Sequence, residues 1–242
     1  MATPTPSRPR AQNLAESVYR QLKSELFEFQ LLPGDRFTEG EVADRTGASR
    51  TPVRQALYRL QREGFLAVNF RSGWEVRPLD FEQLDALYDL RILLEQASVR
   101  RMENLDDEKL DLILTPLERR WNVPAEEQTT DGRQVASWDE DFHCSLVAAS
   151  GNSEFARVHA EVTDRIRIVR RLDFTQHARI VATFREHASM LSSLRERAFS
   201  KAAEQLARHI ECSRDEARKL TLLKLQSARQ NLAVRHRSSG GD

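Results

Sequence analysis

The sequence predicts a mainly α-helical protein of two domains: a small N-terminal domain of helices with a β-hairpin, then a larger all-α helical bundle. Three observations support this prediction. The chain has 242 residues, whereas one domain usually has about 100 to 200. Apolar residues recur at helical spacing along most of the chain. Strand signals occur only before Pro78, so the β structure belongs to the N-terminal domain.

The N-terminal domain begins with two predicted helices. Apolar residues at helical spacing predict the first helix over 13–30, and the sequence Leu-Pro-Gly-Asp at 32–35 ends it with turn residues. Thr38 is suited to cap a short second helix that ends at Thr46, because Glu41 completes a capping box.

A third helix and a hairpin complete this domain. Ser49 is placed as the N-cap of a helix that runs to about Glu63, and Pro52 is tolerated in its first turn. Two short strands, 65–68 and 74–77, then flank a loop of hairpin length. The order helix, helix, turn, helix, hairpin predicts a winged helix-turn-helix.

Beyond Pro78 the pattern is helical throughout. The predicted helices span 81–103, 106–121, 133–149, 153–171, 179–196 and 199–225. We therefore expect a disordered N-terminal tail over 1–12, the winged helix-turn-helix over 13–78, a helical domain over 79–234 and a disordered tail over 235–242.

Composition narrows the class of protein. Apolar residues make up 40% of the chain, and no apolar run approaches the roughly 20 residues needed to cross a bilayer. The N-terminus lacks the apolar segment of a signal peptide, and Cys144 and Cys212 form no CxxC pair, so we expect a cytoplasmic protein with free thiols. The net charge is zero, but residues 1–79 carry 12 Lys and Arg against 9 Asp and Glu, a weak indication of nucleic acid there.

Two arginines on the third helix are candidate DNA contacts. Arg50 and Arg54 share one face at i and i+4, opposite the apolar face. The start of a recognition helix meets base edges, and arginine is well shaped for a bidentate contact to guanine. Arg71 and Gly73 at the hairpin tip are placed to approach the neighbouring groove. The alternative for both helical arginines is a solvated helix face.

The segment 47–57, Gly-Ala-Ser-Arg-Thr-Pro-Val-Arg-Gln-Ala-Leu, follows Leu-Pro-Gly at 32–34 and precedes Glu-Gly at 63–64. It closely resembles the DNA-binding domain of GntR-family regulators. The resemblance implies that Arg50, Thr51 and Arg54 contact DNA and that Gly73 occupies the wing tip. It also implies a homodimer on double-stranded, palindromic operator DNA.

The chain departs from some members of that family at one position. Those members have a further DNA-contacting arginine on the second helix, where this sequence has Gly40. Their operator sequence therefore does not transfer to this chain.

A second candidate site lies in the helical domain. Asp139 and His143 are four residues apart on one predicted helix, and His187 and His209 lie on two later helices beside apolar neighbours. One carboxylate and three imidazoles suit Zn²⁺ or a related divalent ion in a helix bundle, and Ni and Mn remain open. An ordinary set of structural histidines is the alternative.

This order of residues resembles the FCD sensor domain of the FadR-like branch of GntR regulators. The resemblance rests on Asp139-x-x-Phe142-His143, on Ala-Ser-Gly-Asn at 149–152 and on Glu-His at 186–187. It implies that Asp139, His143, His187 and His209 bind a metal, which in turn receives an oxygen-bearing effector.

Two arginines are expected to bind a carboxylate effector. Arg165 is placed on the same helical face as three valines, Val158, Val162 and Val169. Arg91 lies on the first helix of the domain, and a salt bridge between Arg91 and Glu95 is the alternative. Charge-assisted bonds from these guanidinium groups would suit a small carboxylate.

The remaining histidines and cysteines receive no functional role from the sequence. His159, His177 and His236 are expected at the surface. Cys212 is expected to be a small buried residue, and Cys144 to point away from His143.

Two other functions compete with a metabolite-sensing transcriptional regulator, which we expect to be a repressor or an activator and no enzyme. Three histidines and a carboxylate can activate water in a metallohydrolase, but no HExxH motif or nucleophile elbow is present, and such an enzyme leaves the N-terminal domain unexplained. A winged helix can also serve as a protein-interaction module, whose binding would lack the steep salt dependence of phosphate contacts.

Overall fold

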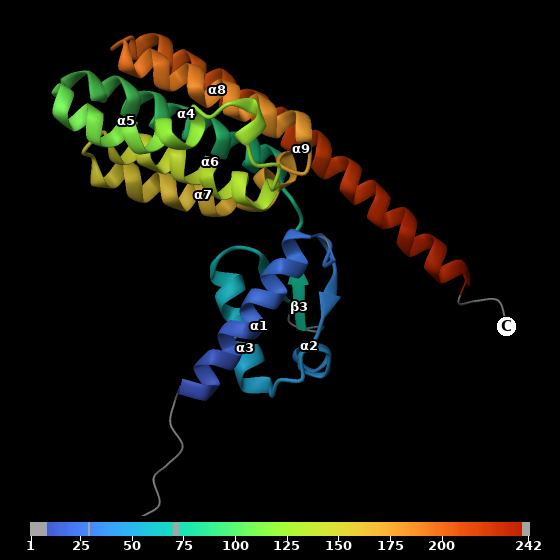
Figure 1. The fold of residues 1–242 in the computed structure, drawn as a ribbon. Coiled ribbons are helices and arrows are strands. Elements are labelled where there is room, and N and C mark those ends of the chain that lie inside the picture. The colour runs from blue at the N-terminus through green and yellow to red at the C-terminus, as the bar shows by residue number, and fades with distance from the viewer. Residues whose placement is uncertain (1–8, 29, 70–72, 239–242) are drawn as a thin grey trace, which may run out of the picture. The chain divides into compact units, whose positions relative to one another are not determined.

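The computed structural model describes residues 9–28, 30–69 and 73–238, and the chain divides into two compact units (Figure 1). One unit comprises Met1–Leu79 together with Lys224–Asp242, and the other comprises Asp80–Leu223. Among the described residues, every helix is too short or too polar to span a lipid bilayer.

The N-terminal unit contains three helices and a small antiparallel sheet. Strand β3 lies in the middle of the sheet, since Trp74 is paired with Phe37 of β1 on one side and with Val68 of β2 on the other. The sequence predicted only the hairpin, because a two-residue strand such as β1 has no detectable periodicity. The elements are α1 (Pro9–Phe27), β1 (Arg36–Phe37), α2 (Glu39–Thr46), α3 (Arg50–Arg62), β2 (Leu66–Asn69) and β3 (Gly73–Val76).

Local sequence explains where α2 and α3 begin and end. The Thr38 hydroxyl accepts the backbone N–H of Glu41, and the Glu41 carboxylate accepts the Thr38 N–H at 2.7 Å, which confirms the capping box. Gly47 ends α2 in the left-handed region with φ +64°, where glycine avoids the steric cost of a Cβ. Ser49 is the N-cap of α3, although its side chain makes no capping hydrogen bond.

One apolar core holds this unit together. The inward faces of α1 and α3 meet in it, and Trp74 and Val76 of the sheet close it. Its buried members are Val18, Tyr19, Leu22, Leu26, Leu31, Phe37, Val42, Ala48, Val53, Ala56, Leu57, Leu60, Leu66, Trp74 and Val76. The burial of one face of α3 leaves its other face exposed to solvent.

The second unit is an all-α bundle. Its helices are α4 (Phe81–Arg101), α5 (Asp107–Trp121), α6 (Gly132–Ala148), α7 (Ser153–Asp173), α8 (His177–Arg195) and α9 (Phe199–Ser238), with short 3₁₀ turns η1 (Met102–Asn104) and η2 (Ala125–Glu127). The limits of α4 to α8 lie within two residues of the sequence prediction. The last helix was predicted to end near Leu225, but it continues to Ser238 and includes the first four residues of the expected disordered tail. Similarly, α1 begins at Pro9, inside the expected N-terminal tail.

Helix α6 occupies the centre of the bundle, because it packs against α4, α5, α7 and α8 (Figure 1). Its inward face carries Val135, Phe142 and Leu146, all of which are buried. Asp139 and His143 share that face, so the fold places a carboxylate and an imidazole in the apolar interior.

Candidate DNA-binding surface and metal centre

Helix α3 presents its first turns to solvent. Arg50, Thr51 and Arg54 are exposed, whereas Val53 and Leu57 face the core. The predicted division of the helix into a buried face and a polar face is therefore confirmed. Tyr58 was not considered from the sequence; it is 49% exposed one turn beyond Arg54, with its ring 5.2 Å from that of Trp74.

Arg54 does not extend freely into solvent. Its Nε donates to Glu39 Oε1 at 2.9 Å, and its Nη2 donates to Glu39 Oε2 at 2.8 Å. The hydrogen bond from Arg54 holds the pKa of Glu39 below its usual range. Glu39 thus fixes the plane of the guanidinium group, and a DNA base or phosphate would compete with this carboxylate for the same N–H donors.

Gly73 has a structural reason to be glycine. Its φ is +87°, and a Cβ would lie 2.7 Å from the Phe37 carbonyl oxygen, so a side chain would clash with β1. The structure therefore ties Gly73 to the pairing of β1 with β3. Arg71 lies outside the described residues.

The four candidate metal ligands come together in the bundle. Asp139 and His143 come from α6, His187 from α8 and His209 from α9, and all four are buried. One donor atom from each lies within 4.8 Å of the other three. Asp139 Oδ1 is 3.3 Å from His187 Nε2, 3.5 Å from His143 Nε2 and 3.6 Å from His209 Nε2.

These separations fit a single divalent ion. Two donors bound tetrahedrally at about 2.1 Å from one ion lie about 3.4 Å apart. Asp139 Oδ1 is buried and, among the described residues, has no hydrogen-bond partner. A buried carboxylate oxygen without a partner is costly, and a cation between it and three imidazole nitrogens would satisfy it. The cluster is consistent with a metal site.

Two carboxylates orient the imidazole rings of His143 and His209 from the side that faces away from the centre of the cluster. His143 Nδ1 lies 2.5 Å from Glu95 Oε2, and His209 Nδ1 lies 2.7 Å from Glu186 Oε2. With Nδ1 bonded to a carboxylate, Nε2 carries the lone pair that faces the centre of the cluster. Neither carboxylate was assigned this role from the sequence.

The electrostatics keep Glu95 and Asp139 charged and the imidazoles of His143 and His187 neutral. Burial raises the pKa of Glu95, but Arg91 and His143 outweigh burial and hold the pKa well below its usual range. Burial likewise raises the pKa of Asp139, and Arg170 with His143 lowers it well below the usual value. Burial lowers the pKa of His187 to about 3. A neutral imidazole and an ionised carboxylate are the forms that bind metal.

The arginines around the cluster differ from those predicted. Arg91 is buried, and its Nε donates to Glu95 Oε1 at 2.6 Å, which is the salt bridge weighed as its alternative role. Arg165 is exposed, so the prediction that it faces the core is wrong. Instead, Arg170 of the same helix is buried and donates to Asp139 Oδ2, and Arg179 donates to Glu186 Oε2 at 2.9 Å.

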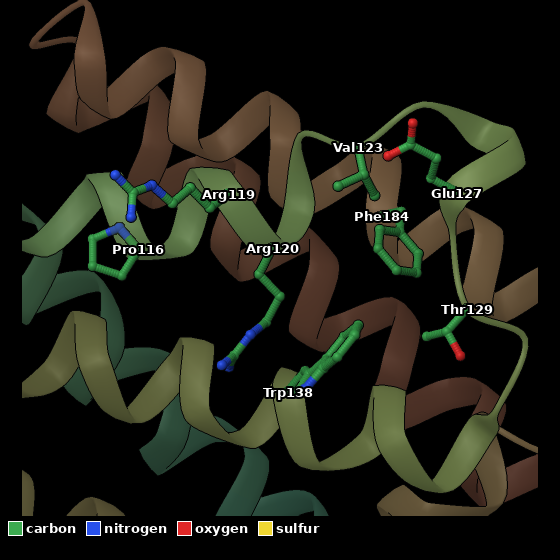
Figure 2. A pocket seen from close by; sticks show the side chains of 8 residues that line it. All are labelled: Pro116, Arg119, Arg120, Val123, Glu127, Thr129, Trp138 and Phe184. Atoms are coloured by element: carbon green, nitrogen blue, oxygen red, sulfur yellow. The ribbon is translucent and has the colours of Figure 1, made fainter.

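An aromatic wall encloses His187. The Phe142 ring stacks on the imidazole at a centroid distance of 3.8 Å and an angle of 10°, and Trp121 packs against it at 4.2 Å. Phe184 continues this wall, 5.0 Å from Trp121, and also lines an open hollow of about 360 Å³ (Figure 2). Figure 2 shows Arg120 beside Trp138 at this hollow. None of the four ligands lines it, so the wall separates the hollow from the metal cluster.

Of the four candidate ligands, His209 borders a surface hollow. Together with Glu186, Arg185 and Arg208 it lines a space of about 330 Å³ between α8 and α9. Cys212 also lines this hollow and is exposed, so the expectation that it is a buried core residue is wrong.

The three remaining histidines were expected at the surface, and the structure bears this out for only some of them. His159 was expected at the surface, but it is 1% exposed and its Nε2 lies 2.9 Å from Glu95 Oε1. His177 is exposed as expected, and the side chain of His236 lies outside the described residues. Cys144 Sγ lies 3.9 Å from His159 Nδ1, and burial raises the pKa of this thiol to about 11, which keeps it unreactive at neutral pH.

The fold and these two sites define a DNA-binding regulator with a helical sensor domain, and comparison with known proteins agrees. Residues 14–76 match the family model of bacterial regulatory proteins of the gntR family, and residues 86–211 match that of the FCD domain. The chain belongs to the GntR family of transcriptional regulators, in the FadR-like branch that carries an FCD domain.

Individual relatives lead to the same family. The Nta operon transcriptional regulator of Aminobacter aminovorans is 31% identical over 185 residues, 76% of this chain and 84% of its own length. The uncharacterized HTH-type transcriptional regulator YdhC of Bacillus subtilis is 29% identical over 79% of this chain and 85% of its own length. The solved structure of E. coli McbR/YncC shares the fold with a TM-score of 0.61 at 22% identity, over 85% of this chain and 97% of its own.

These relatives exclude the metallohydrolase alternative, because they are transcriptional regulators and not enzymes. The chain is therefore a DNA-binding transcriptional regulator, and its buried Asp and His cluster is part of a regulatory domain.

Proposed function

We propose that this regulator binds operator DNA as a homodimer and that a metal-bound small carboxylate controls its affinity for that operator. The observation that carries the proposal is the set of three buried imidazole nitrogens that lie 3.3 to 3.6 Å from the buried Asp139 Oδ1, with a carboxylate behind two of the three rings. We assign residues 13–78 to DNA binding and 79–234 to sensing.

On the DNA side, Arg50, Thr51 and Arg54 form the reading surface of α3, with Arg71 and Gly73 at the wing. The exposure of Arg50, Thr51 and Arg54 and their position at the start of α3 support this assignment. A single recognition helix reads a short half-site, so two copies related by two-fold symmetry provide the specificity of a palindromic operator.

On the sensing side, Asp139, His143, His187 and His209 hold one divalent ion, with Zn²⁺ favoured by the three imidazoles and Ni or Mn as alternatives. The bound ion would supply a positive charge and, by accepting a further ligand beyond these four, a coordination position for a carboxylate oxygen. The counter-charge proposed for Arg91 or Arg165 is best supported at Arg91, because Arg91 Nη2 is buried without a hydrogen-bond partner among the described residues.

Coupling between carboxylate binding and DNA binding is expected because the proposed metal ligands lie on three different helices. A ligand on the metal can change the spacing of α6, α8 and α9 only to the extent that it binds one arrangement of the bundle more tightly than another. Operator DNA must then change the affinity for the carboxylate by the same factor as the carboxylate changes the affinity for DNA.

The test uses an operator selected by the purified full-length protein from a random DNA pool. Operator affinity is measured by fluorescence anisotropy with zinc-loaded protein, with and without acetate, propionate or butyrate. We expect at least one acid to shift the affinity of the wild type and none to shift that of chelated protein or of His187→Ala. An operator affinity that never responds to metal or acid would contradict the proposal, even if DNA binding itself is intact.

A further inference from the structure

The hollow in front of the aromatic wall lies apart from the metal cluster (Figure 2). It has a volume of about 360 Å³ and is bounded by the end of α5, the segment that follows α5, and α6 and α8. Its lining residues are Pro116, Arg119, Arg120, Val123, Glu127, Thr129, Trp138 and Phe184. Pockets for small molecules span about 300 to 1,000 Å³, so the hollow is large enough for one small ligand.

Two aromatic rings form the apolar part of this hollow. Trp138 is half-buried and Phe184 is buried, and both line the space. Trp121 packs behind both of them, with its ring centroid 6.4 Å from that of Trp138 and 5.0 Å from that of Phe184. Since Trp121 is itself only 1% exposed, it holds these rings in place before any ligand arrives. A planar ring is the ligand group that packs best against such a surface.

Two arginines line the same hollow. Arg119 is exposed, and within the described part of the chain its side chain has no ion pair or hydrogen bond. Arg120 Nη1 donates to Asp141 at 3.2 Å, but the two side chains are 35% and 59% exposed, so the pair is weak enough for a ligand to replace Asp141. The guanidinium carbon of Arg120 lies 5.3 Å from the centroid of the Trp138 ring. Positive charge therefore lies directly beside the aromatic surface.

The charges of the lining lie on opposite sides of the hollow. Figure 2 shows Glu127 on the loop across from Arg119 and Arg120. A negative group is therefore attracted on the side of the arginines and repelled on the side of Glu127. This arrangement favours a ligand with one negative charge over a ligand that carries a second one at its far end.

We propose that the hollow binds a planar aromatic acid with one negative charge, at a site separate from the metal cluster. The ring packs against Trp138 and Phe184, and the acid group forms charge-assisted hydrogen bonds with Arg119 and Arg120. The site does not depend on the proposed function, because it needs no metal ion.

The experiment uses full-length protein kept in chelator, so that no acid can bind through a metal. Calorimetry measures the affinity for benzoate and for three matched compounds. Cyclohexanecarboxylate keeps the charge and loses the planar ring, benzyl alcohol keeps the ring and loses the charge, and terephthalate adds a second charge at the far end. We expect benzoate to bind at least about threefold tighter than each of them, the range expected for one aromatic contact or one exposed ion pair.

Two exposed residues of the lining can be changed with little risk to the fold. Arg119→Gln should weaken benzoate binding at least about threefold, because one charge-assisted bond is lost. Glu127→Gln should remove the difference between benzoate and terephthalate, because the repelling charge is gone. The control is Arg100→Gln, which removes an exposed arginine of α4 outside the lining and should bind benzoate as the wild type does.

The aromatic contact has its own variant. Trp138→Leu should weaken the binding of benzoate more than that of cyclohexanecarboxylate, with circular dichroism as the check that the protein is folded. If this variant is unfolded, the two exposed-residue variants decide the matter.

The outcomes separate this site from the metal centre. Benzoate that binds only to zinc-loaded protein would overturn the inference and leave the proposed function standing. Benzoate that binds chelated protein and Arg119→Gln equally well would also overturn it, because the acid then lies elsewhere. Binding in chelator that follows the expected order supports the site even if no acid changes operator affinity.

Discussion

The proposed DNA-reading surface and the proposed metal centre both contain an ion pair between an arginine and a carboxylate, one exposed and one buried. On α3, Arg54 pairs with Glu39 while its side chain is 58% exposed. In the bundle, Arg170 pairs with Asp139 while both side chains are at most 6% exposed. Exposed ion pairs contribute little to stability because water and salt screen them, whereas loss of one partner from a buried pair leaves an uncompensated charge. The first pair is therefore free to exchange its partner for DNA, and the second is fixed to the fold.

The difference between the exposed and the buried ion pair is tested most strongly by removal of the arginine from the buried pair. Arg170→Met leaves the Asp139 carboxylate without its cation, so we expect metal-free protein to lose on the order of 3 to 5 kcal/mol of unfolding free energy. Urea denaturation with chelator measures this loss. The matched surface change, Arg54→Met, should leave the midpoint almost unchanged. Equal losses of stability in the two variants would contradict the claim that the buried ion pair stabilises the fold more than the exposed one.

Metal addition should act on the bundle alone. Zinc at about 100 times its dissociation constant stabilises a protein that binds one ion by about 2.7 kcal/mol. We expect this gain in unfolding free energy, measured by urea denaturation, for the wild type and not for Asp139→Asn or His187→Ala. A rise of the same size in both variants would mean that zinc binds somewhere else.

The pH dependence of the unfolding free energy tests whether the Asp173 carboxyl group is buried. Burial raises the pKa of Asp173 to about 7 from an ordinary value of 3.8. Because the folded pKa is higher, the stability that this group contributes is complete below pH 3.8 and is lost as pH rises through 7. In metal-free protein, Asp173→Asn should gain on the order of 2 kcal/mol relative to the wild type between about pH 5 and about pH 8. A stability difference independent of pH would show that Asp173 is not buried in its charged form.

The smallest effect on stability and the clearest effect on function belong to α3. Arg50→Ala and Arg54→Ala should each weaken operator binding about tenfold or more, because a bidentate contact to a base is lost. Circular dichroism should show folded protein in both cases. Arg20→Ala removes an exposed arginine of α1, 76% exposed, and serves as the control. If the variants on α3 bind the operator as tightly as this control, the reading face lies elsewhere.

The sequence predicted the parts of these sites that depend on local pattern. The exposed arginines of α3 and the pair Asp139 and His143 follow from helical spacing within one element. Glu95, Arg170 and Arg179 were missed because their roles depend on how separate helices pack, which spacing within one helix does not reveal.

Arg165 shows how a small rotation about the helix axis decides whether a residue is assigned to the buried or the exposed face. Val162 and Val169 are buried as that face requires, but the buried face of α7 is centred on Ile166 and continues to Arg170 on its other side, so Arg165 lies just outside it. One residue turns a side chain by about 100° around a helix, enough to move a charge from the core to solvent.

The central claim is that the buried cluster holds a metal ion in a regulator. Its most direct test is elemental analysis of protein saturated with zinc and then dialysed, with His187→Ala in parallel. We predict one zinc per chain in the wild type and a loss of most of that zinc in the variant. A wild type that retains no metal, or a variant that retains as much as the wild type, would contradict the claim.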